Sequence, residues 1–260
     1  MKISIITPTL NQGEFIEDTI RSVLDQDHRD VEHIVIDGGS TDGTLEILKR
    51  FTHLLWTSGK DGGQAEAINR GFRAAGGEVI AWLNSDDYYD ANILGAVAAY
   101  FDSHPECMML YGDISYVSRD RRFLYSLTGD TITYAALVRS PDIVRQPSFF
   151  WRKSILEEVG YLDEGLHLVM DFDFILRIAR RHSPHYLKKN LSFFRWYEQS
   201  KTASRQRRQV LELHRVYRKN HVRPGFRGYR FLLGKYLDTL EPGNPLRRSL
   251  ALFRKKRPAV

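Results

Sequence analysis

The stretch VIAWLNSDD at residues 79–87 decides the fold, because a short apolar run ends there in two adjacent carboxylates. Val79 to Leu83 is the nearly continuous apolar block typical of a strand buried on both faces of a parallel sheet. Ligands of such sheets bind beyond the carboxyl ends of the strands, so Asp86 and Asp87 are expected in a ligand crevice. Adjacent carboxylates repel each other, and a divalent cation keeps both ionised. Oxygen ligands of this kind suit Mg²⁺ or Mn²⁺ bound together with substrate phosphates.

A polar turn or a helix N-cap is the alternative explanation of the two carboxylates, because Asp is common in both. The preceding sequence favours the ligand site, since strand-like and helix-like patterns alternate through it. Strands are expected at residues 2–7, 33–36 and 54–56, and helices at residues 14–26, 45–51 and 65–72. Strand–helix units repeated at this spacing are typical of an α/β fold with a mostly parallel, Rossmann-like sheet flanked by helices.

The pattern becomes less regular after a helix expected near residues 91–101. Strands are expected at residues 108–111, 114–117 and 149–151, and helices at residues 155–159 and from Asp171 onward. Residues 119–145 show no pattern that predicts an element. Asp173 and Arg177 lie four residues apart in the last of these helices, so we expect them to form a solvated ion pair.

Charge divides the 260-residue chain into two parts. Residues 201–260 carry 17 Lys and Arg against three Asp and Glu, a net charge of +14, whereas residues 1–200 carry 21 against 29, a net charge of −8. No apolar run is long enough to cross a bilayer. The single cysteine, Cys107, excludes a disulfide within the chain and fits a reducing compartment such as the cytoplasm.

The basic region at residues 201–260 is expected to be a helical C-terminal extension. Its apolar side chains recur at helical spacing, at Val210, Leu213, Val216 and Tyr217. Residues 226–240 interleave aromatic and basic side chains, which suits attachment to an anionic membrane surface. The alternative is a solvated basic helix packed against the rest of the chain, and the sequence leaves both open. Nucleic-acid binding is not expected, because no recognised motif accompanies the charge.

Residues suited to ligand contact follow each expected strand at what should be one edge of the sheet. They are Thr7, Pro8, Thr9 and Asn11 after the first strand, Asp37 after the second, Asp61 and Gln64 after the third, and Asp86 and Asp87 after the fourth. A nucleotide diphosphate requires such a set, with polar partners for base and ribose and a cation for the phosphates. The sequence contains neither a P-loop nor a GxGxxG fingerprint, which favours a diphosphate held by metal.

Six short motifs in sequence order resemble those of the family 2 glycosyltransferases, which have the GT-A fold. They are SIITPTLN at 4–11, VIDGGSTDGT at 35–44, DGGQ at 61–64, NSDD at 84–87, GYLDE at 160–164 and MDFDF at 170–174. The resemblance covers residues 1–200 and is nearest to bacterial enzymes that build O-antigen (lipopolysaccharide), capsule or exopolysaccharide. It implies a nucleotide-sugar-binding half at 1–100 and an acceptor-side half at 101–200, with the basic extension at 201–260 outside the catalytic domain.

The resemblance also implies roles for individual residues. Thr7, Pro8, Thr9, Asn11 and Gln64 would bind the nucleotide sugar, with Asp37 and Asp61 near the base and Asp86 at the ribose or donor sugar. Asp87, in the DxD-type metal motif, would ligate the cation, and Asp171 would be the general base. Gln146 is a candidate substrate contact, although a plain strand-end amide is an equal alternative. Relatives often have a His near position 197, where this chain has Tyr197, so a third protein ligand to the metal is not identified.

The function implied is that of an inverting, metal-dependent glycosyltransferase, either a hexosyltransferase or an N-acetylhexosaminyltransferase. The donor would be a UDP- or GDP-linked sugar, and the acceptor a saccharide or a lipid-linked saccharide. The expected location is the cytoplasm, including the cytoplasmic face of the inner membrane. Two alternatives stay open at this point: a nucleotidyltransferase, which also combines an α/β sheet with acidic metal ligands, and a non-catalytic module that binds nucleotide sugars or glycans.

Overall fold

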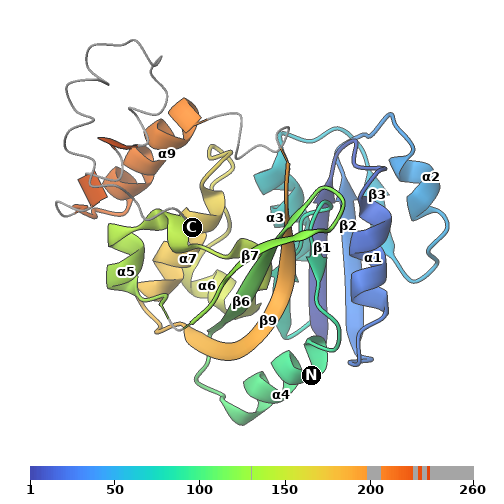
Figure 1. The fold of residues 1–260 in the computed structure, drawn as a ribbon, viewed down its shortest axis with the longest axis horizontal. Coiled ribbons are helices and arrows are strands. Elements are labelled where there is room, and N and C mark those ends of the chain that lie inside the picture. Colours follow the sequence, from blue (N-terminus) through green and yellow to red (C-terminus); the bar gives the residue numbers. More distant parts are fainter. Residues whose placement is uncertain (130, 198–205, 225–227, 230–232, 235–260) are drawn as a thin grey trace.

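The computed structural model describes residues 1–129, 131–197, 206–224, 228–229 and 233–234. Its strands are β1 (Ile3–Thr9), β2 (Val31–Asp37), β3 (Leu55–Ser58), β4 (Val79–Trp82), β5 (Tyr88–Tyr89), β6 (Met109–Ser118), β7 (Phe123–Leu127), β8 (Phe149–Arg152) and β9 (His185–Trp196). Its helices are α1 (Ile16–Leu24), α2 (Thr44–Leu48), α3 (Gln64–Ala74), α4 (Leu94–Ser103), α5 (Tyr134–Arg139), α6 (Ile155–Val159), α7 (Met170–Ala179) and α9 (Gln206–Lys219). Two short 3-10 helices, η1 (Pro141–Ile143) and η2 (Gln146–Ser148), precede β8. Figure 1 shows how these elements are arranged.

The first half of the chain forms the parallel sheet that the sequence predicts. β3 pairs with β2, β2 with β1, and β1 with β4, all in parallel. β2 is covered on both faces. Val35 packs with Ile16 of α1 on one face, and Ile34 and Ile36 join the main core on the other, together with side chains of α3. The carboxyl ends of the four strands therefore meet at one edge, where ligands of such sheets bind.

The second half of the chain continues the same sheet with mixed pairing. β8 pairs antiparallel with β4 and with β6, β6 pairs parallel with β9, and β9 pairs antiparallel with β5. Within the described residues the sheet order is β3-β2-β1-β4-β8-β6-β9-β5, with β7 hydrogen-bonded to β6 as a hairpin. The predicted α/β fold, a Rossmann-like sheet flanked by helices, is confirmed.

Three parts of the second half differ from the sequence expectations. The strands expected at 108–111 and 114–117 are one strand, β6, in which Gly112 interrupts the apolar run because β9 passes close to it: a Cβ there would overlap Leu191. Residues 119–145 contain β7 and α5. The sequence also gives no sign of β9, since Lys188 and Lys189 break its apolar pattern.

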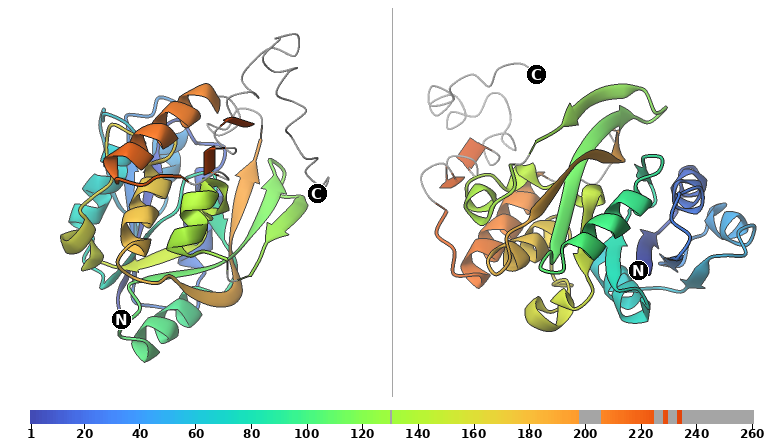
Figure 2. Two further views of the ribbon diagram at one scale, coloured as in Figure 1. Left: turned by 90° about the vertical axis from the view of Figure 1, so that its left-hand side faces the viewer. Right: turned by 90° about the horizontal axis from the view of Figure 1, so that it is seen from below.

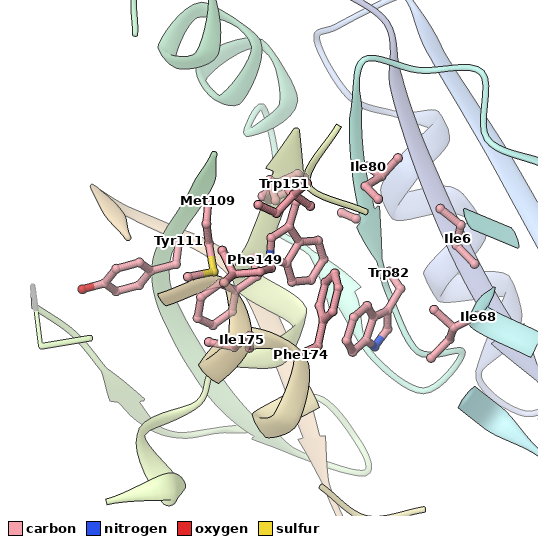
Figure 3. Packing of buried hydrophobic residues seen from close by; sticks show 14 of the residues in the cluster. Ile6, Ile68, Ile80, Trp82, Met109, Tyr111, Phe149, Trp151, Phe174 and Ile175 are labelled. Atoms are coloured by element: carbon pink, nitrogen blue, oxygen red, sulfur yellow. The ribbon is translucent and has the colours of Figure 1, made fainter. Parts of the chain in front are cut away.

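Stacked aromatic rings join the two halves of the sheet (Figure 3). Trp82 of β4 stacks on Trp151 of β8 with 5.1 Å between ring centroids. Phe174 of α7 meets Trp151 edge-on at 5.5 Å, and Phe72 of α3 lies 5.9 Å from Trp82. Each such pair contributes about 0.5–1.5 kcal/mol beyond the burial of its surface. The position of α7 is therefore fixed directly against β4, the strand that leads into the NSDD motif.

A tight turn connects β4 to β5, although β5 lies four places from β4 in the sheet order. Strands in a flat sheet are about 4.8 Å apart, so four places would separate the two by about 19 Å. The turn is closed by the Asp87 amide, which donates to the Asn84 carbonyl at 3.1 Å. A closed turn spans less than about 7 Å, so the sheet has to curl. The strong bend of β9 in Figure 1 shows this curl.

Helix α9, which lies in the described part of the basic region at 201–260, packs on the second half of the chain. Leu213, Val216 and Tyr217 are buried in the main core, and the Tyr217 ring lies 5.8 Å from Phe172 of α7. Figure 2 shows α9 beside α7 in both views. For residues 206–219 the structure thus has the packed-helix arrangement. Most of the basic and aromatic stretch at 226–240 lies outside the described residues. No helix in the described parts of the chain is long and apolar enough to span a membrane.

Candidate active site

A cavity of about 350 Å³ lies beyond the carboxyl ends of β1 and β4. Its walls come from both halves of the chain. The first half contributes Pro8, Thr9, Asp61, Gln64, Asn84 and Asp86, and the second half contributes Gln146, His167, Leu168, Asp171, Phe194 and Tyr197. This volume is within the range of small-molecule sites, which is about 300–1,000 Å³. The structure therefore brings together six of the residues that the sequence predicts for the site: Pro8, Thr9, Asp61, Gln64, Asp86 and Asp171, with the candidate contact Gln146 beside them.

Asp86 is the carboxylate of the NSDD motif that lines the cavity. Its Oδ2 accepts a hydrogen bond of 2.9 Å from the hydroxyl of Tyr197, just beyond the end of β9. Burial, together with the negative charge of Asp86, raises the pKa of the Tyr197 hydroxyl above its ordinary value. Tyr197 therefore keeps its proton at neutral pH and acts as a donor to Asp86.

Asp87 lies beneath the cavity rather than in its wall, with 1% of its surface exposed. Its Oδ1 accepts the backbone N–H of Arg195 in β9 at 3.0 Å, and its Oδ2 faces the Asn84 amide at 3.4 Å. Burial raises the pKa of the Asp87 carboxyl well above its usual range, and the nearby charge of Asp86 adds to this. In this arrangement Asp87 joins the motif to β9, and its expected role as the metal ligand stays a prediction.

The chemistry of the site fits a divalent cation held mainly by its substrate. Among the described residues, no group of three or more His, Cys, Asp or Glu side chains is arranged to bind a metal ion. Mg²⁺ commonly takes only one or two protein carboxylates and completes its shell with waters and substrate phosphates. Asp86 meets that requirement, because it is a carboxylate facing a cavity large enough for a diphosphate.

A chain of side-chain amides crosses the cavity wall. Gln146 Nε2 donates to the Trp82 carbonyl at 2.7 Å, Asn84 Nδ2 donates to Gln146 Oε1 at 3.0 Å, and Gln64 Nε2 donates to Asn84 Oδ1 at 2.8 Å. A carbonyl can only accept, so the Trp82 oxygen fixes the orientation of all three amides. Gln146 is thus both a structural amide and a cavity residue, which combines the two alternatives from the sequence. The sequence assigns no role to Asn84, the centre of this chain.

Asp171 faces the cavity from the first turn of α7. Its Oδ1 accepts the backbone N–H of Phe172 at 2.8 Å, which holds the carboxylate at the start of the helix. Burial raises the pKa of Asp171 to about 6, while the backbone N–H groups act in the opposite direction. A carboxylate with a pKa near neutrality is a stronger base than an ordinary Asp and is still ionised at pH 7.

Thr9 and Asp61 occupy the part of the cavity next to β1. The Thr9 hydroxyl is buried and has no hydrogen-bond partner in the described structure, although buried polar atoms are normally paired. Asp61 Oδ1 accepts the Gly63 N–H at 2.9 Å, which leaves the other carboxylate oxygen for further contacts. These two side chains are therefore the best-placed partners for a polar ligand in this part of the site.

Three other predicted residues do not line the cavity. The Thr7 hydroxyl is buried and pairs with His33 at 2.8 Å. The Asn11 side chain accepts the Thr41 N–H at 2.8 Å. Asp37 is fully buried, and its two oxygens accept hydrogen bonds within its own turn and from the next strand: from the amides of Gly39 and Ser40 and the hydroxyls of Ser40 and Ser58. Thr7, Asn11 and Asp37 thus hold strands and loops together behind the cavity wall, and the Asp37 carboxylate closes a polar turn with the amides of Gly39 and Ser40.

Tyr197, Phe194, His167 and Leu168 line the cavity although the sequence does not assign them to it. Phe194 and Tyr197 come from the end of β9, the strand that sequence patterns miss. Tyr197 does occupy the neighbourhood in which relatives often have a His. The one available signal was therefore the aromatic run at residues 193–197, directly before the basic extension.

The fold and the site define a glycosyltransferase of the GT-A type, with acidic side chains around a cavity at the carboxyl edge of the parallel strands. A family model described as "Glycosyl transferase family 2" matches residues 4–160, and the chain belongs to this family. The resemblance found in the sequence motifs is thereby confirmed.

The chain is similar to named glycosyltransferases of bacteria. It is 31% identical over 180 residues to a PGL/p-HBAD biosynthesis glycosyltransferase of Mycobacterium bovis (strain BCG / Pasteur 1173P2), which covers 67% of this chain and 68% of the relative. Over 91 residues it is 41% identical to TuaG of Bacillus subtilis, whose name refers to teichuronic acid biosynthesis, covering 33% of this chain and 36% of TuaG.

Two solved structures share the fold. S. aureus TarS 1-349 in complex with UDP-GlcNAc superposes with a TM-score of 0.67 at 19% identity, covering 98% of this chain and 76% of that chain. The mannosyltransferase PcManGT of Pyrobaculum calidifontis, in complex with GDP-Man and Mn²⁺, superposes with a TM-score of 0.63 at 19% identity, covering 97% and 79%. At this level of identity the two confirm the predicted GT-A architecture.

Proposed function

We propose that this protein transfers a sugar from a UDP- or GDP-linked donor to a hydroxyl of a saccharide acceptor, with inversion at the anomeric carbon. The observation that carries this proposal is the placement of Asp86 and Asp171 in the walls of one cavity, on elements from the two halves of the chain. Family membership and the donors bound by TarS and PcManGT support it. The names of the bacterial relatives support a role in cell-surface polysaccharide biosynthesis.

The first half of the chain would bind the donor. Thr9 and Asp61 would contact the nucleoside, because their free polar atoms lie next to β1. Asp86 would face the diphosphate and hold a divalent cation, Mg²⁺ or Mn²⁺, together with the phosphate oxygens. When bound, such a cation would neutralise the charge that develops on the leaving diphosphate. Tyr197 would hold the Asp86 carboxylate in place through the hydrogen bond that it donates.

Asp171 would act as the general base. The acceptor oxygen forms a bond to the anomeric carbon while the bond from that carbon to the diphosphate oxygen breaks. The proton of the acceptor hydroxyl passes to Asp171, which is ionised above pH 6. A sugar hydroxyl is far less acidic than a carboxylic acid, so the proton moves only as the new bond forms and the oxygen becomes acidic. Attack from the face opposite the diphosphate gives inversion.

The acceptor would be a saccharide or a lipid-linked saccharide at the cytoplasmic face of the membrane. The buried free thiol of Cys107 fits a reducing compartment. Attachment of the basic extension to anionic lipid is a part of this proposal, supported by its net charge of +14. Each basic residue near an anionic surface contributes about 1 kcal/mol, so contact by a few of these side chains would be enough for attachment.

Turnover of a donor panel tests the proposal. The purified full-length chain is incubated with UDP-glucose, UDP-galactose, UDP-GlcNAc and GDP-mannose, with Mn²⁺, with Mg²⁺ and with EDTA, and released UDP or GDP is measured by chromatography. We expect one donor to be hydrolysed slowly, and faster when a mixture of bacterial lipid-linked saccharides is added. Release of pyrophosphate from a nucleoside triphosphate would instead indicate a nucleotidyltransferase. Binding of a nucleotide sugar with no release of nucleotide under any condition would indicate a non-catalytic module.

A further inference from the structure

The basic helix α9 contains one buried acid, Glu212, with 7% of its surface exposed. Its Oε2 accepts two backbone N–H groups, from His167 at 2.9 Å and from Leu168 at 2.8 Å. Its Oε1 accepts Nε of Arg208 at 2.9 Å, one turn earlier in α9. The carboxylate is therefore fixed at both oxygens, and one of them is committed to the backbone of a distant loop.

That loop is part of the cavity wall. The side chains of His167 and Leu168 line the cavity, and so does Asp171, three residues after Leu168. Val169 ends the loop as the N-cap of α7, and its carbonyl accepts the Asp173 N–H at 3.0 Å, in the first turn of the helix. The position of the loop backbone thus determines where α7 begins and where the Asp171 carboxylate points.

A second group of bonds joins α9 to α7 itself. Asp173 is fully buried, and its carboxylate accepts Nζ of Lys219 at 3.1 Å and Nδ2 of Asn220 at 2.9 Å. The expected pair of Asp173 with Arg177 is present at 3.0 Å, but the expectation that it is solvated is wrong, because α9 covers it. Lys219 also donates to Asp163 at 2.9 Å, before the loop. Helix α9 is therefore hydrogen-bonded to the chain both before and after Asp171.

We infer that Glu212 is a positioning residue of the sugar-transfer site: by binding the amides of His167 and Leu168 it fixes the cavity wall that carries Asp171. This inference rests on the proposed role of Asp171. It makes α9, in the extension outside the family motifs, a part of the catalytic unit. Without the carboxylate, two backbone N–H groups at the wall lose their acceptor, and buried amides without a partner are costly. The loop would then move toward solvent to hydrate them.

The test compares three substitutions at Glu212 with a matched control. Glu212→Ala removes the acceptor. Glu212→Asp keeps the charge but withdraws the carboxylate by one methylene group. Glu212→Gln keeps an oxygen in the place of Oε2 and so retains a neutral acceptor for both amides. Arg208→Ala is the control, because it removes the ion pair of Glu212 and leaves the two amide bonds in place.

Two measurements are made on each full-length variant. Hydrogen–deuterium exchange followed by mass spectrometry reports on a peptide covering residues 166–170. Steady-state hydrolysis of UDP-GlcNAc or GDP-mannose, whichever the wild type turns over faster, gives kcat and KM. We expect Glu212→Ala and Glu212→Asp to speed exchange at residues 166–170 at least tenfold and to lower kcat at least tenfold, with the donor KM within about twofold. Glu212→Gln should recover most of kcat, and Arg208→Ala should resemble the wild type.

The outcomes separate this inference from the proposed function. Unchanged exchange at residues 166–170 in both Glu212→Ala and Glu212→Asp would overturn the inference, whatever the activity. Faster exchange with an unchanged kcat would also overturn it, because the loop would then be free to move without affecting Asp171. If the wild type hydrolyses no donor, the proposed function fails, while the exchange measurement still decides whether Glu212 holds the loop. Should Glu212→Ala fail to fold, Glu212→Asp and Glu212→Gln carry the comparison.

Discussion

The hydroxyl of Tyr197 donates a hydrogen bond of 2.9 Å to Oδ2 of Asp86, in the wall of the cavity. The two residues lie 111 positions apart and come from opposite halves of the chain. One of the two oxygens of the carboxylate is therefore held by the protein, and the orientation of the other is set by it. This gives the cavity a carboxylate whose direction does not depend on a bound ligand.

Tyr197→Phe removes this donor and leaves the ring. Hydrogen bonds to charged groups contribute about 1.5–3 kcal/mol, and we expect the lower end here because water can replace the phenol, so that metal-dependent binding of UDP or GDP weakens roughly tenfold. Isothermal titration calorimetry with Mn²⁺ measures the effect. Tyr125→Phe, on the exposed strand β7, is the matched control. Equal affinities in the two variants would show that Asp86 needs no help from Tyr197.

Asp86→Ala and Asp87→Ala are expected to fail in different ways. The first removes the carboxylate that faces the cavity, so turnover and the metal dependence of nucleotide binding should disappear while the melting temperature changes little. The second leaves the buried N–H of Arg195 without an acceptor, which costs about 1–3 kcal/mol of stability. Thermal melts and nucleotide titrations with and without Mn²⁺ separate the two. If Asp87→Ala loses metal dependence at full stability, Asp87 is the metal ligand, as the sequence motif predicts.

Asp171→Asn keeps the size of the side chain but cannot accept the acceptor proton. General base catalysis commonly contributes 100-fold or more, so we expect kcat to fall at least about 100-fold with the donor KM nearly unchanged. In the wild type, kcat should rise with pH through the Asp171 pKa of about 6 and level off above it, because only the ionised carboxylate is a base. A pH profile of kcat that is flat between pH 5 and 8 would assign the base to another residue.

The same substitution is expected to stabilise the protein at neutral pH. The pKa of Asp171 is raised from 3.8 to about 6 on folding, so the folded state favours the neutral carboxyl. The ionised carboxyl therefore lowers the free energy of unfolding. This effect grows as the pH rises from about 4 to 6 and is complete above pH 6. Asp171→Asn should add about 1–2 kcal/mol at pH 7.5, less than the shift alone implies because cavity water screens the charge, and little at pH 4. Urea unfolding at the two pH values measures this, and equal effects at both would contradict the raised pKa.

Gln146→Glu tests the chain of amides. At neutral pH the new carboxylate cannot donate to the Trp82 carbonyl, so we expect a loss of stability of about 1–3 kcal/mol. Lowering the pH protonates the carboxyl and restores a donor, and the loss should shrink as the pH falls toward 5. Urea unfolding at pH 7.5 and pH 5, with the wild type measured beside it, gives the difference. A penalty that does not depend on pH would show that the direction of the amides is not fixed by Trp82.

The basic extension is expected to attach the enzyme reversibly to anionic membranes. Residues 201–260 carry a net charge of +14, and the attraction is screened within about 10 Å at 0.1 M salt. The full chain should therefore sediment with vesicles that contain phosphatidylglycerol and remain in solution with phosphatidylcholine vesicles. About 0.5 M salt should release it from the anionic vesicles, because the screening length becomes shorter as the salt concentration rises. Equal behaviour with both kinds of vesicle would leave the packing of α9 on the core as the role of the extension.

The first half of the fold follows from local sequence patterns, whereas the second half follows from them only in part: β8, α6 and α7 are predicted, but β7, α5 and β9 are not. Strands β1, β2 and β4 are short apolar runs between amphipathic helices, and such patterns identify buried parallel strands. β9 has a lysine pair at 188–189 and is recognisable only through its pairing with β6, which depends on the fold around it. Sequence patterns report local periodicity, and long-range pairing of this kind leaves no local trace.

The same limit applies to the site. Asp171, Asp86 and Asp61 could be predicted because each lies at a strand end or helix start within a motif. Asp37 has the same position, but its oxygens are taken by its own turn and by Ser58 of β3, which depends on rotamers rather than on spacing. The bond between Asn84 and Gln146 joins residues 62 positions apart, and no spacing rule could have found it.

The tight turn between β4 and β5 makes the width of the active site depend on the number of residues in that turn. Loops on protein surfaces usually tolerate insertions, because added residues extend into solvent. Here Asn84–Asp87 bridges two strands that only a curled sheet brings close, so each added residue would let the sheet open. Opening the sheet would carry the β9 end, with Tyr197, away from Asp86. The NSDD motif is thus a spacer as well as the candidate metal motif, and we expect added residues in it to be poorly tolerated.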